Sequence, residues 1–424
     1  MCETGGPVGE GTINAGNLFL SLSDAVDLAS PNIARHQQRT AYIATAIANA
    51  AGLPEHEKRT IFIAALLHDT GAITVEEKIA LHDFETDAVR KHCVRGELLL
   101  RRIPELEREA TLVRHHHTEW REWEQPIDLS PVFCSQILLL ADYVERLIHR
   151  NRYILHQREE IVARVRAVSG TMAHPLVVER FLEAAKAEAF WLDLISPRLF
   201  SMLFHQGPLR GSEIDYRRLE NVSELFRDLI DFKSPFTATH TSGVSACADM
   251  LARLAGLDED ACRELRIAGN LHDLGKLAMP TSILEKRGPL TRAETEIIRS
   301  HSYHTYGTIA SIAGLERIAE LAGYHHERLD GSGYPFQRVA SELTIGARIL
   351  AVADTFTAVT EDRPYRKGME RDRIERIMGE MARGRSLDSD AVALLLAHIG
   401  ETTDRVEGAQ RAARDFYESR IDVA

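Results

Sequence analysis

Apolar residues recur every three or four positions along most of the chain, as they do on the buried face of an amphipathic helix. Clear examples lie at residues 41–48 and 61–67. Combinations that end helices, such as Ser30-Pro31 and Gly52-Leu53-Pro54, separate these faces. The alternation that is typical of strands is scarce. The pattern predicts an all-α protein.

Two sets of histidines and aspartates repeat along the chain at matching intervals. The first two histidines of each set are 32 residues apart, and the third and fourth are 24 residues apart. Ten of the nineteen histidines belong to these sets, so we expect two tandem helical domains with the same plan. The first set is His36, His68, Asp69, His92, His116, His117 and Asp142, and the second is His240, His272, Asp273, His301, His325, His326 and Asp354.

The length of 424 residues also suits two domains better than one. Residues 1–17 are Gly-rich and without periodicity, and we expect a loose leader there. We place the first domain at residues 18–205 and the second at 213–424. A Gly/Pro-containing linker at 206–212 joins them.

Charge and composition exclude some functions. The 51 basic and 63 acidic residues give a net charge of −12, which argues against binding to a DNA or RNA polymer. The five cysteines are scattered, as in proteins of a reducing compartment. Neither a signal peptide nor an apolar run of membrane-spanning length is evident. We therefore expect a cytoplasmic protein that does not bind membranes.

The chemistry of the second set points to metal. Five imidazoles and two carboxylates are more than a single tetrahedral zinc requires. A pair of divalent metals is the usual device for activating water against a phosphate ester. The same region continues with Lys276, with Gly333-Tyr334-Pro335 and with Arg363-Pro364-Tyr365-Arg366.

With these motifs, residues 213–382 resemble the HD-GYP family of bacterial cyclic-dinucleotide phosphodiesterases. The resemblance implies two tandem HD-type helical domains, each around a metal site. It implies catalytic roles for Asp273 and Lys276, the latter one helical turn after His272 if that helix persists. Substrate would contact Gly333, Tyr334, Arg363 and Arg366. One metal would take His240, His272, Asp273 and Asp354, and the other Asp273, His301, His325 and His326, with Asp273 bridging.

The activity that the resemblance implies is hydrolysis of a 3′,5′-cyclic dinucleotide. The substrate would be cyclic di-GMP or 3′,3′-cyclic GMP-AMP, and the products the linear dinucleotide and, after a second cut, mononucleotides. Iron or manganese is favoured, with nickel, cobalt, zinc and magnesium as alternatives. The resemblance leaves open a homodimer.

Two other classes of function stay in view. An HD-type nucleotide phosphohydrolase would not need the Gly-Tyr-Pro and Arg-Pro-Tyr-Arg motifs. A non-catalytic cyclic-dinucleotide sensor would usually have lost metal ligands, and the second domain has lost none.

Departures from the family pattern refine these expectations. Phe236 stands where trinuclear members carry a glutamate, so we expect two metals rather than three. Thr357 stands where members commonly carry an aspartate, which puts some phosphate or water contacts in doubt.

The first domain keeps all seven ligand positions as a second candidate metal site, but Ala72 replaces the lysine and no Gly-Tyr-Pro follows. A metallated regulatory domain is favoured there, over an active phosphohydrolase with another substrate. His115 leaves the register of His116 and His117 open by one residue.

Overall fold

The computed structural model describes residues 12–27, 34–82, 89–233, 239–286, 288–361 and 368–421. The chain forms two compact units, residues 15–212 and residues 213–423, and the segment up to Asn14 belongs to the second unit. Strand β1 (Ile13–Asn14) pairs antiparallel with strand β2 (Glu213–Ile214) in that unit. The predicted leader of residues 1–17 overlaps described structure, because β1 and the start of α1 at Ala15 lie within it.

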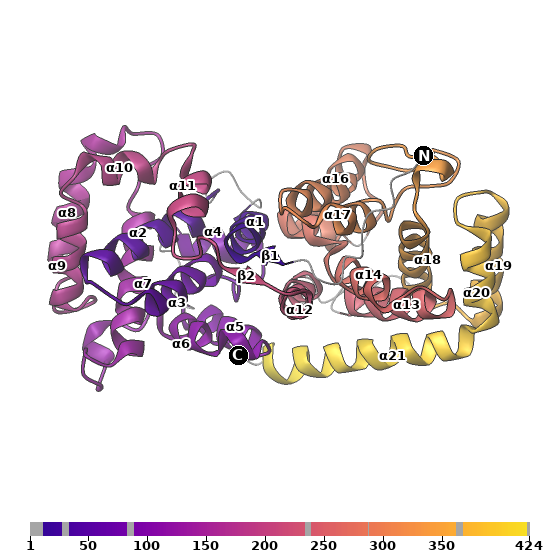
Figure 1. The fold of residues 1–424 in the computed structure, drawn as a ribbon, viewed down its shortest axis with the longest axis horizontal. Helices are drawn as coiled ribbons and strands as arrows, with labels where there is room; N and C mark the ends of the chain where they lie inside the picture. Colours follow the sequence, from indigo (N-terminus) through magenta and orange to yellow (C-terminus); the bar gives the residue numbers. More distant parts are fainter. Residues whose placement is uncertain are drawn as a thin grey trace. The chain divides into compact units, whose positions relative to one another are not determined.

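Within its described residues, the named elements of the N-terminal unit are all helices (Figure 1). Its helices are α1 (Ala15–Asp27), α2 (His36–Ala50), α3 (Glu55–Leu67), α4 (Val75–His82), α5 (Val89–Leu100), η2 (Pro104–Leu106), α6 (Glu107–His115), η3 (Trp120–Glu122), α7 (Ser130–Arg146), η4 (Ile154–His156), α8 (Arg158–Ala167), α9 (Pro175–Ala184), α10 (Glu188–Leu194) and α11 (Leu199–Gln206). Helix α2 packs against α3, α7 and α9, and its apolar face, from Ala41 to Ala48, is buried among them.

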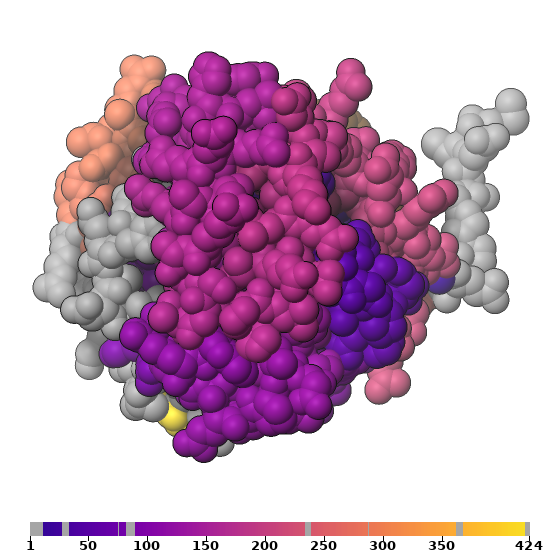
Figure 2. Space-filling view, turned by 90° about the vertical axis from the view of Figure 1, so that its left-hand side faces the viewer, coloured from indigo at the N-terminus to yellow at the C-terminus, as the bar shows by residue number. Residues whose placement is uncertain are grey.

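The helices that follow α7 cover the centre of the face turned to the viewer in Figure 2, in magenta. A groove of about 830 Å³ lies on these helices, lined by residues such as Leu155, Val162, Leu182 and Lys186. None of the seven predicted ligands of this unit lines it.

The C-terminal unit repeats the plan. Its helices are α12 (Tyr216–Phe232), α13 (His240–Leu254), α14 (Glu259–Leu271), η5 (Leu274–Ala278), α15 (Thr281–Leu284), α16 (Arg292–Ala310), α17 (Glu316–Gly323), η6 (Ala340–Glu342), α18 (Ile345–Thr360), α19 (Arg371–Arg383), α20 (Ser389–Ala397), α21 (Ile399–Phe416) and the final π-helical turn η7 (Tyr417–Ile421). Helix α13 lies at the centre and packs against α14, α18 and the long α21 (Figure 1). The all-α prediction is confirmed, since two-residue strands are the longest among the described residues.

Side-chain caps define where several of these helices begin. Asp258, Thr344 and Asp388 accept hydrogen bonds from the first-turn amides of α14, α18 and α20. Thr291 and Glu294 form a capping box at the start of α16.

The histidine-bearing helices α2 and α13 are instead capped from the preceding helix. The Asp27 carboxylate accepts from the Gln37 amide at 3.0 Å, and the Asp231 carboxylate accepts from the amides of Thr241 and Ser242 at 2.8 and 3.1 Å. Each aspartate lies nine residues before the histidine that opens the helix, which extends the internal repeat.

No helix within the described ranges is long and apolar enough to cross a membrane.

Candidate metal centres

The C-terminal unit brings together the seven side chains that the sequence singled out there. They come from different helices, and each lies at a helix end or on a buried helix face. His240 begins α13, His272 and Asp273 directly follow α14, His301 lies in α16, His325 and His326 follow α17, and Asp354 lies in α18.

Asp273 lies between two groups of histidines. Its Oδ2 is 3.2 Å from Nε2 of His272, and its Oδ1 is 3.2 Å from Nε2 of His301 and 4.0 Å from Nε2 of His325. On the His272 side, Asp354 Oδ1 is 3.0 Å from His240 Nε2. The ligand atoms form two clusters, each within 4.8 Å: His240, His272 and Asp273 in one, and His301, His325 and His326 in the other.

The backbone fixes the orientation of three of these rings. In His272, His301 and His325 the Nδ1–H donates to the carbonyl oxygen three residues earlier, at 2.9, 2.6 and 2.6 Å. This contact leaves Nε2 as the lone-pair nitrogen directed at the cluster, as in metal-ligating histidines. His272 Nε2 and Asp273 Oδ1 are buried and make no hydrogen bond to other described residues. A divalent cation would satisfy both atoms, so the donor set fits one.

Electrostatics favours the same ligand states at His325, His326 and Asp273, whereas at His240 burial is outweighed by the neighbouring Glu361 and Asp354 carboxylates, which raise its pKa to about 10. Burial lowers the pKa of His325 well below its ordinary value and that of His326 to about 3, so both rings are neutral. Burial alone would raise the pKa of Asp273, but Lys276 and His272 hold it well below its ordinary range. Neutral imidazole and ionised carboxylate are the forms that bind a metal ion.

Lys276 contacts this centre directly. Its Nζ is 2.6 Å from Asp273 Oδ2, and the side chain is 21% exposed. The sequence placed it one helical turn after His272 on the condition that the helix persists. That condition is not met, because α14 ends at Leu271 and Lys276 lies in the 3₁₀ helix η5. Buried Lys233 holds this segment by donating to the carbonyl oxygens of Lys276 and Leu277 at 2.8 and 2.6 Å.

The Gly-Tyr-Pro loop lies beside the second histidine cluster. A Cβ on Gly333 would lie 2.5 Å from both Arg328 N and Glu327 Cα, so this close backbone approach requires glycine. The Tyr334 amide donates to the His326 carbonyl at 3.2 Å, and the two rings are 4.8 Å apart. The Arg299 guanidinium lies 4.3 Å from the centre of the Tyr334 ring, within cation–π range. Three further residues of the sequence prediction, Arg363, Arg366 and Phe236, lie outside the described residues.

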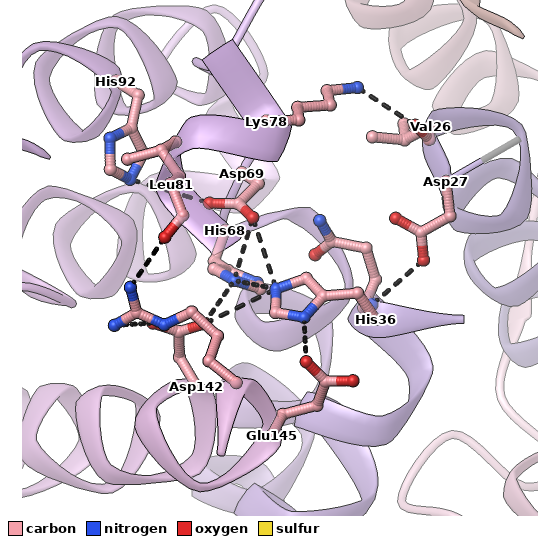
Figure 3. A network of polar contacts seen from close by, with 12 residues as sticks. Val26, Asp27, His36, His68, Asp69, Lys78, Leu81, His92, Asp142 and Glu145 are labelled. Atoms are coloured by element: carbon pink, nitrogen blue, oxygen red, sulfur yellow. Dashed lines mark hydrogen bonds and ion pairs between the residues drawn. The ribbon is translucent and has the colours of Figure 1, made fainter. Parts of the chain in front are cut away.

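A second centre in the N-terminal unit has the same arrangement, and Figure 3 shows Asp69 between its histidines. Asp69 Oδ2 is 3.3 Å from His36 Nε2 and 3.4 Å from His68 Nε2, while its Oδ1 is 3.6 Å from His92 Nε2 and 3.9 Å from His116 Nε2.

Asp142 completes this N-terminal centre, with Oδ1 3.5 Å from His36 Nε2 and Oδ2 3.9 Å from His117 Nε2. His115 instead contacts Thr118 and the ring of Trp123. The structure thus places His116 beside Asp69 and His117 beside Asp142.

Several residues at these sites were not found from the sequence. In the N-terminal centre the Arg146 guanidinium lies 3.0 Å from Asp142 Oδ2. This centre therefore also has a positively charged side chain, although Ala72 stands in place of the lysine. Glu145 contacts Nδ1 of His36, and Glu361 contacts Nδ1 of His240. The available signal was a carboxylate within two helical turns after each ligand aspartate, which is too common to use alone.

Two regions of the chain match models of the HD domain, residues 33–147 and residues 224–391. The chain is 30% identical over 398 residues to 3′3′-cGAMP-specific phosphodiesterase 1 of Vibrio cholerae, across 91% of this chain and 92% of that protein. The chain belongs to the HD-GYP family of cyclic-dinucleotide phosphodiesterases. A cyclic di-GMP phosphodiesterase of Thermotoga maritima is 37% identical over 150 residues, which cover 35% of this chain and 41% of that protein.

The fold is also shared with a solved structure. A cyclic GMP-AMP specific phosphodiesterase of V. cholerae superposes with a TM-score of 0.64 at 24% identity, over 92% of this chain and 98% of the other. HD domains bind divalent metal ions, and both units of this HD-GYP protein supply clustered histidine and aspartate ligands for them.

Proposed function

We propose that the C-terminal unit hydrolyses a phosphodiester bond of a 3′,5′-cyclic dinucleotide and yields the linear dinucleotide. The observation that carries this proposal is the position of Asp273 between two histidine clusters, with Lys276 and Tyr334 beside them. We place 3′,3′-cyclic GMP-AMP ahead of cyclic di-GMP, because the relative aligned over nine-tenths of the chain is named for the former.

Two divalent cations fit this donor set, and we propose that Asp273 would bind both. When bound, such a pair supplies an activated water and neutralises charge at the phosphate. Ligation rich in imidazole with carboxylates suits iron or manganese. One ion would take His240, His272, Asp273 and Asp354, and the other Asp273, His301, His325 and His326.

The remaining residues act on the substrate. The Lys276 ammonium is close enough to the cluster to neutralise a phosphate oxygen and to stabilise charge developing on it. Gly333 lets the loop backbone approach closely, and Tyr334 provides an aromatic surface beside His326. Arg363 and Arg366 remain predicted phosphate contacts, since guanidinium groups bind phosphate oxygens in pairs.

For the N-terminal unit we propose metal binding in a regulatory role. Its histidines and aspartates converge as they do in the C-terminal unit. However, Ala72 stands in place of the lysine, and the Arg146 guanidinium is paired with Asp142 and donates to the Leu81 carbonyl at 2.9 Å. A phosphohydrolase activity of this unit on another nucleotide is the alternative.

The decisive assay is turnover of both cyclic dinucleotides by protein loaded with manganese or reduced iron, with products separated by chromatography. Asp273→Asn and Asp69→Asn remove corresponding carboxylates, and Asp404→Asn, at an exposed position of α21, is the control. We expect only Asp273→Asn to reduce the first cleavage to background.

If Asp69→Asn opened the cyclic dinucleotide but no longer cleaved the linear product to mononucleotides, that second cleavage would be assigned to the N-terminal unit. Binding of a cyclic dinucleotide without turnover by the metal-loaded wild type would instead favour the sensor function.

A further inference from the structure

The two units hold the first histidine of their centres with carboxylates from different turns of corresponding helices. In the N-terminal unit Glu145, three residues after Asp142, lies 2.5 Å from His36 Nδ1 (Figure 3). In the C-terminal unit Glu361, seven residues after Asp354, lies 3.0 Å from His240 Nδ1. Both units thus have a carboxylate that contacts Nδ1 of the first histidine. Counted from the ligand aspartate, the carboxylate of the C-terminal unit lies four residues later in the sequence, about one helical turn.

Thr357 occupies the position that corresponds to Glu145. It is fully buried, and its Oγ1 makes no hydrogen bond to other described residues. Its hydroxyl therefore does not substitute for the missing carboxylate. Glu361 instead follows the last residue of α18, and its amide still donates to the Thr357 carbonyl at 3.1 Å. This bond keeps its carboxylate close to the turn that Thr357 occupies.

The support of each carboxylate has changed as well. In the N-terminal unit Arg39, three residues after His36, donates from Nε to Glu145 Oε1 at 2.6 Å. The corresponding residue, three after His240, is Gly243.

Gly243 makes room for a side chain from the C-terminal helix. A Cβ there would lie 2.9 Å from Gln410 Nε2 and 2.9 Å from Thr357 Cγ2. Gln410, on α21, donates to Glu361 Oε1 at 2.9 Å. The two units thus differ at positions 243 and 357 in a way that fits a single alternative arrangement. In the C-terminal unit, Gln410 of α21 supplies the hydrogen-bond donor that Arg39 supplies in the N-terminal unit.

We propose that Glu361 is the positioning residue of the C-terminal centre, and that Gln410 holds it in place. The inference rests on the proposed metal site. His272, His301 and His325 are oriented by backbone carbonyls, whereas His240 is oriented by a side chain. A carboxylate that accepts Nδ1–H fixes the tautomer and directs Nε2 at the metal. Loss of such a partner typically weakens metal binding about 10–100-fold.

The test is equilibrium competition for manganese between the full chain and a chelator, in an Asp69→Asn background that isolates the C-terminal centre. We expect Glu361→Ala to weaken binding about 10–100-fold. Glu361→Gln should weaken it less, because an amide oxygen can still accept from Nδ1. The KM for the cyclic dinucleotide, measured at saturating manganese, should not change, because Glu361 contacts the ligand histidine rather than the substrate.

A rescue variant separates this role from a general structural one. Thr357→Glu, added to Glu361→Ala, returns the carboxylate to the register seen at Glu145 and should restore most of the manganese affinity. Gln410→Ala should weaken binding several-fold, whereas Glu407→Ala, at an exposed position of α21, should leave it unchanged. Thermal unfolding of each metal-free variant verifies folding, and Glu361→Gln and Gln410→Ala carry the test if Glu361→Ala does not fold.

Wild-type affinity in folded Glu361→Ala, in Glu361→Gln or in Gln410→Ala would overturn the inference, as would failure of the rescue. A different result would overturn the proposed function. If Asp273→Asn, in the same Asp69→Asn background, left manganese binding unchanged, the proposed metal site itself would be wrong. The two failures are therefore distinguishable.

Discussion

Replacing Gly275 with alanine should both destabilise the C-terminal unit and disrupt its metal centre. An added Cβ would lie 2.0 Å from the His301 carbonyl oxygen, where real contacts are at least 3.0 Å. The η5 segment and α16 must therefore separate by about 1 Å, the difference between these two distances. Overpacking of this kind costs about 1–3 kcal/mol, or roughly 2–12 °C in Tm for a unit of this size.

The same displacement acts on function, because η5 begins directly after Asp273 and α16 carries His301. A misplacement of 1 Å in a reacting site can lower activity by about 100-fold. Thermal unfolding monitored by circular dichroism, retained manganese per chain and kcat/KM measure these effects on one preparation.

Gly307→Ala is the matched control, since Gly307 lies in the same helix α16 and an added Cβ there meets nothing within 4 Å. Alanine in a helix interior is more stable than glycine by about 0.5–1 kcal/mol, so this variant should melt slightly higher. The two substitutions thus have opposite predicted signs. Equal melting temperatures and equal metal retention would refute the reasoning.

Three further predictions concern single groups. Lys276→Ala should lower kcat about 10²–10³-fold with metal content unchanged, and a loss of bound metal would show instead a purely structural role. His117→Ala should reduce manganese bound by the N-terminal unit, whereas His115→Ala should not, and the reverse result would contradict the register. Burial raises the pKa of Asp24 to about 6, so the folded state binds this proton more tightly than the unfolded state. Its contribution to stability should therefore fall as the pH rises from about 4 to 6. The free energy of unfolding, measured by denaturant titration across that range, should change less with pH in Asp24→Asn than in the wild type.

Much of the site was predictable because intervals between ligands are a property of the sequence. His240 and His272 lie 32 residues apart, as His36 and His68 do, so the spacing predicted two domains with one plan. The family resemblance then placed each pair in a common centre. The neighbours that support these ligands depend on where helices end, and helix ends are difficult to predict from the local sequence. The change from α14 to the 3₁₀ helix η5 at Lys276 is one example.

The supporting carboxylates were harder to predict because their contacts cross the fold. Glu361 reaches His240, 121 residues away in sequence, and is itself held by Gln410, 49 residues further along. Gly243 carries no motif, and its significance appears only when the Gln410 side chain is seen beside it. Such contacts join residues that are far apart in the sequence, and the hydrophobic periodicity of the chain does not show which of them will pack together.

The pairing of β1 with β2 has a consequence for topology. The chain enters the C-terminal unit at Ile13, leaves it for residues 15–212, and returns at Glu213, so the N-terminal unit is an insertion in the other. Ile13 is 1% exposed, and its Cδ1 would lie 3.0 Å from a Cβ on Gly314. A fragment cut at residue 213 would therefore lose a buried side chain and the partner of its first strand. During synthesis β1 emerges some 200 residues before β2, and closing such a long loop is slow. The inserted unit can thus fold before its host is complete. A version of the host without the insertion must retain β1, for example through a short turn that joins Asn14 to its register partner Glu213.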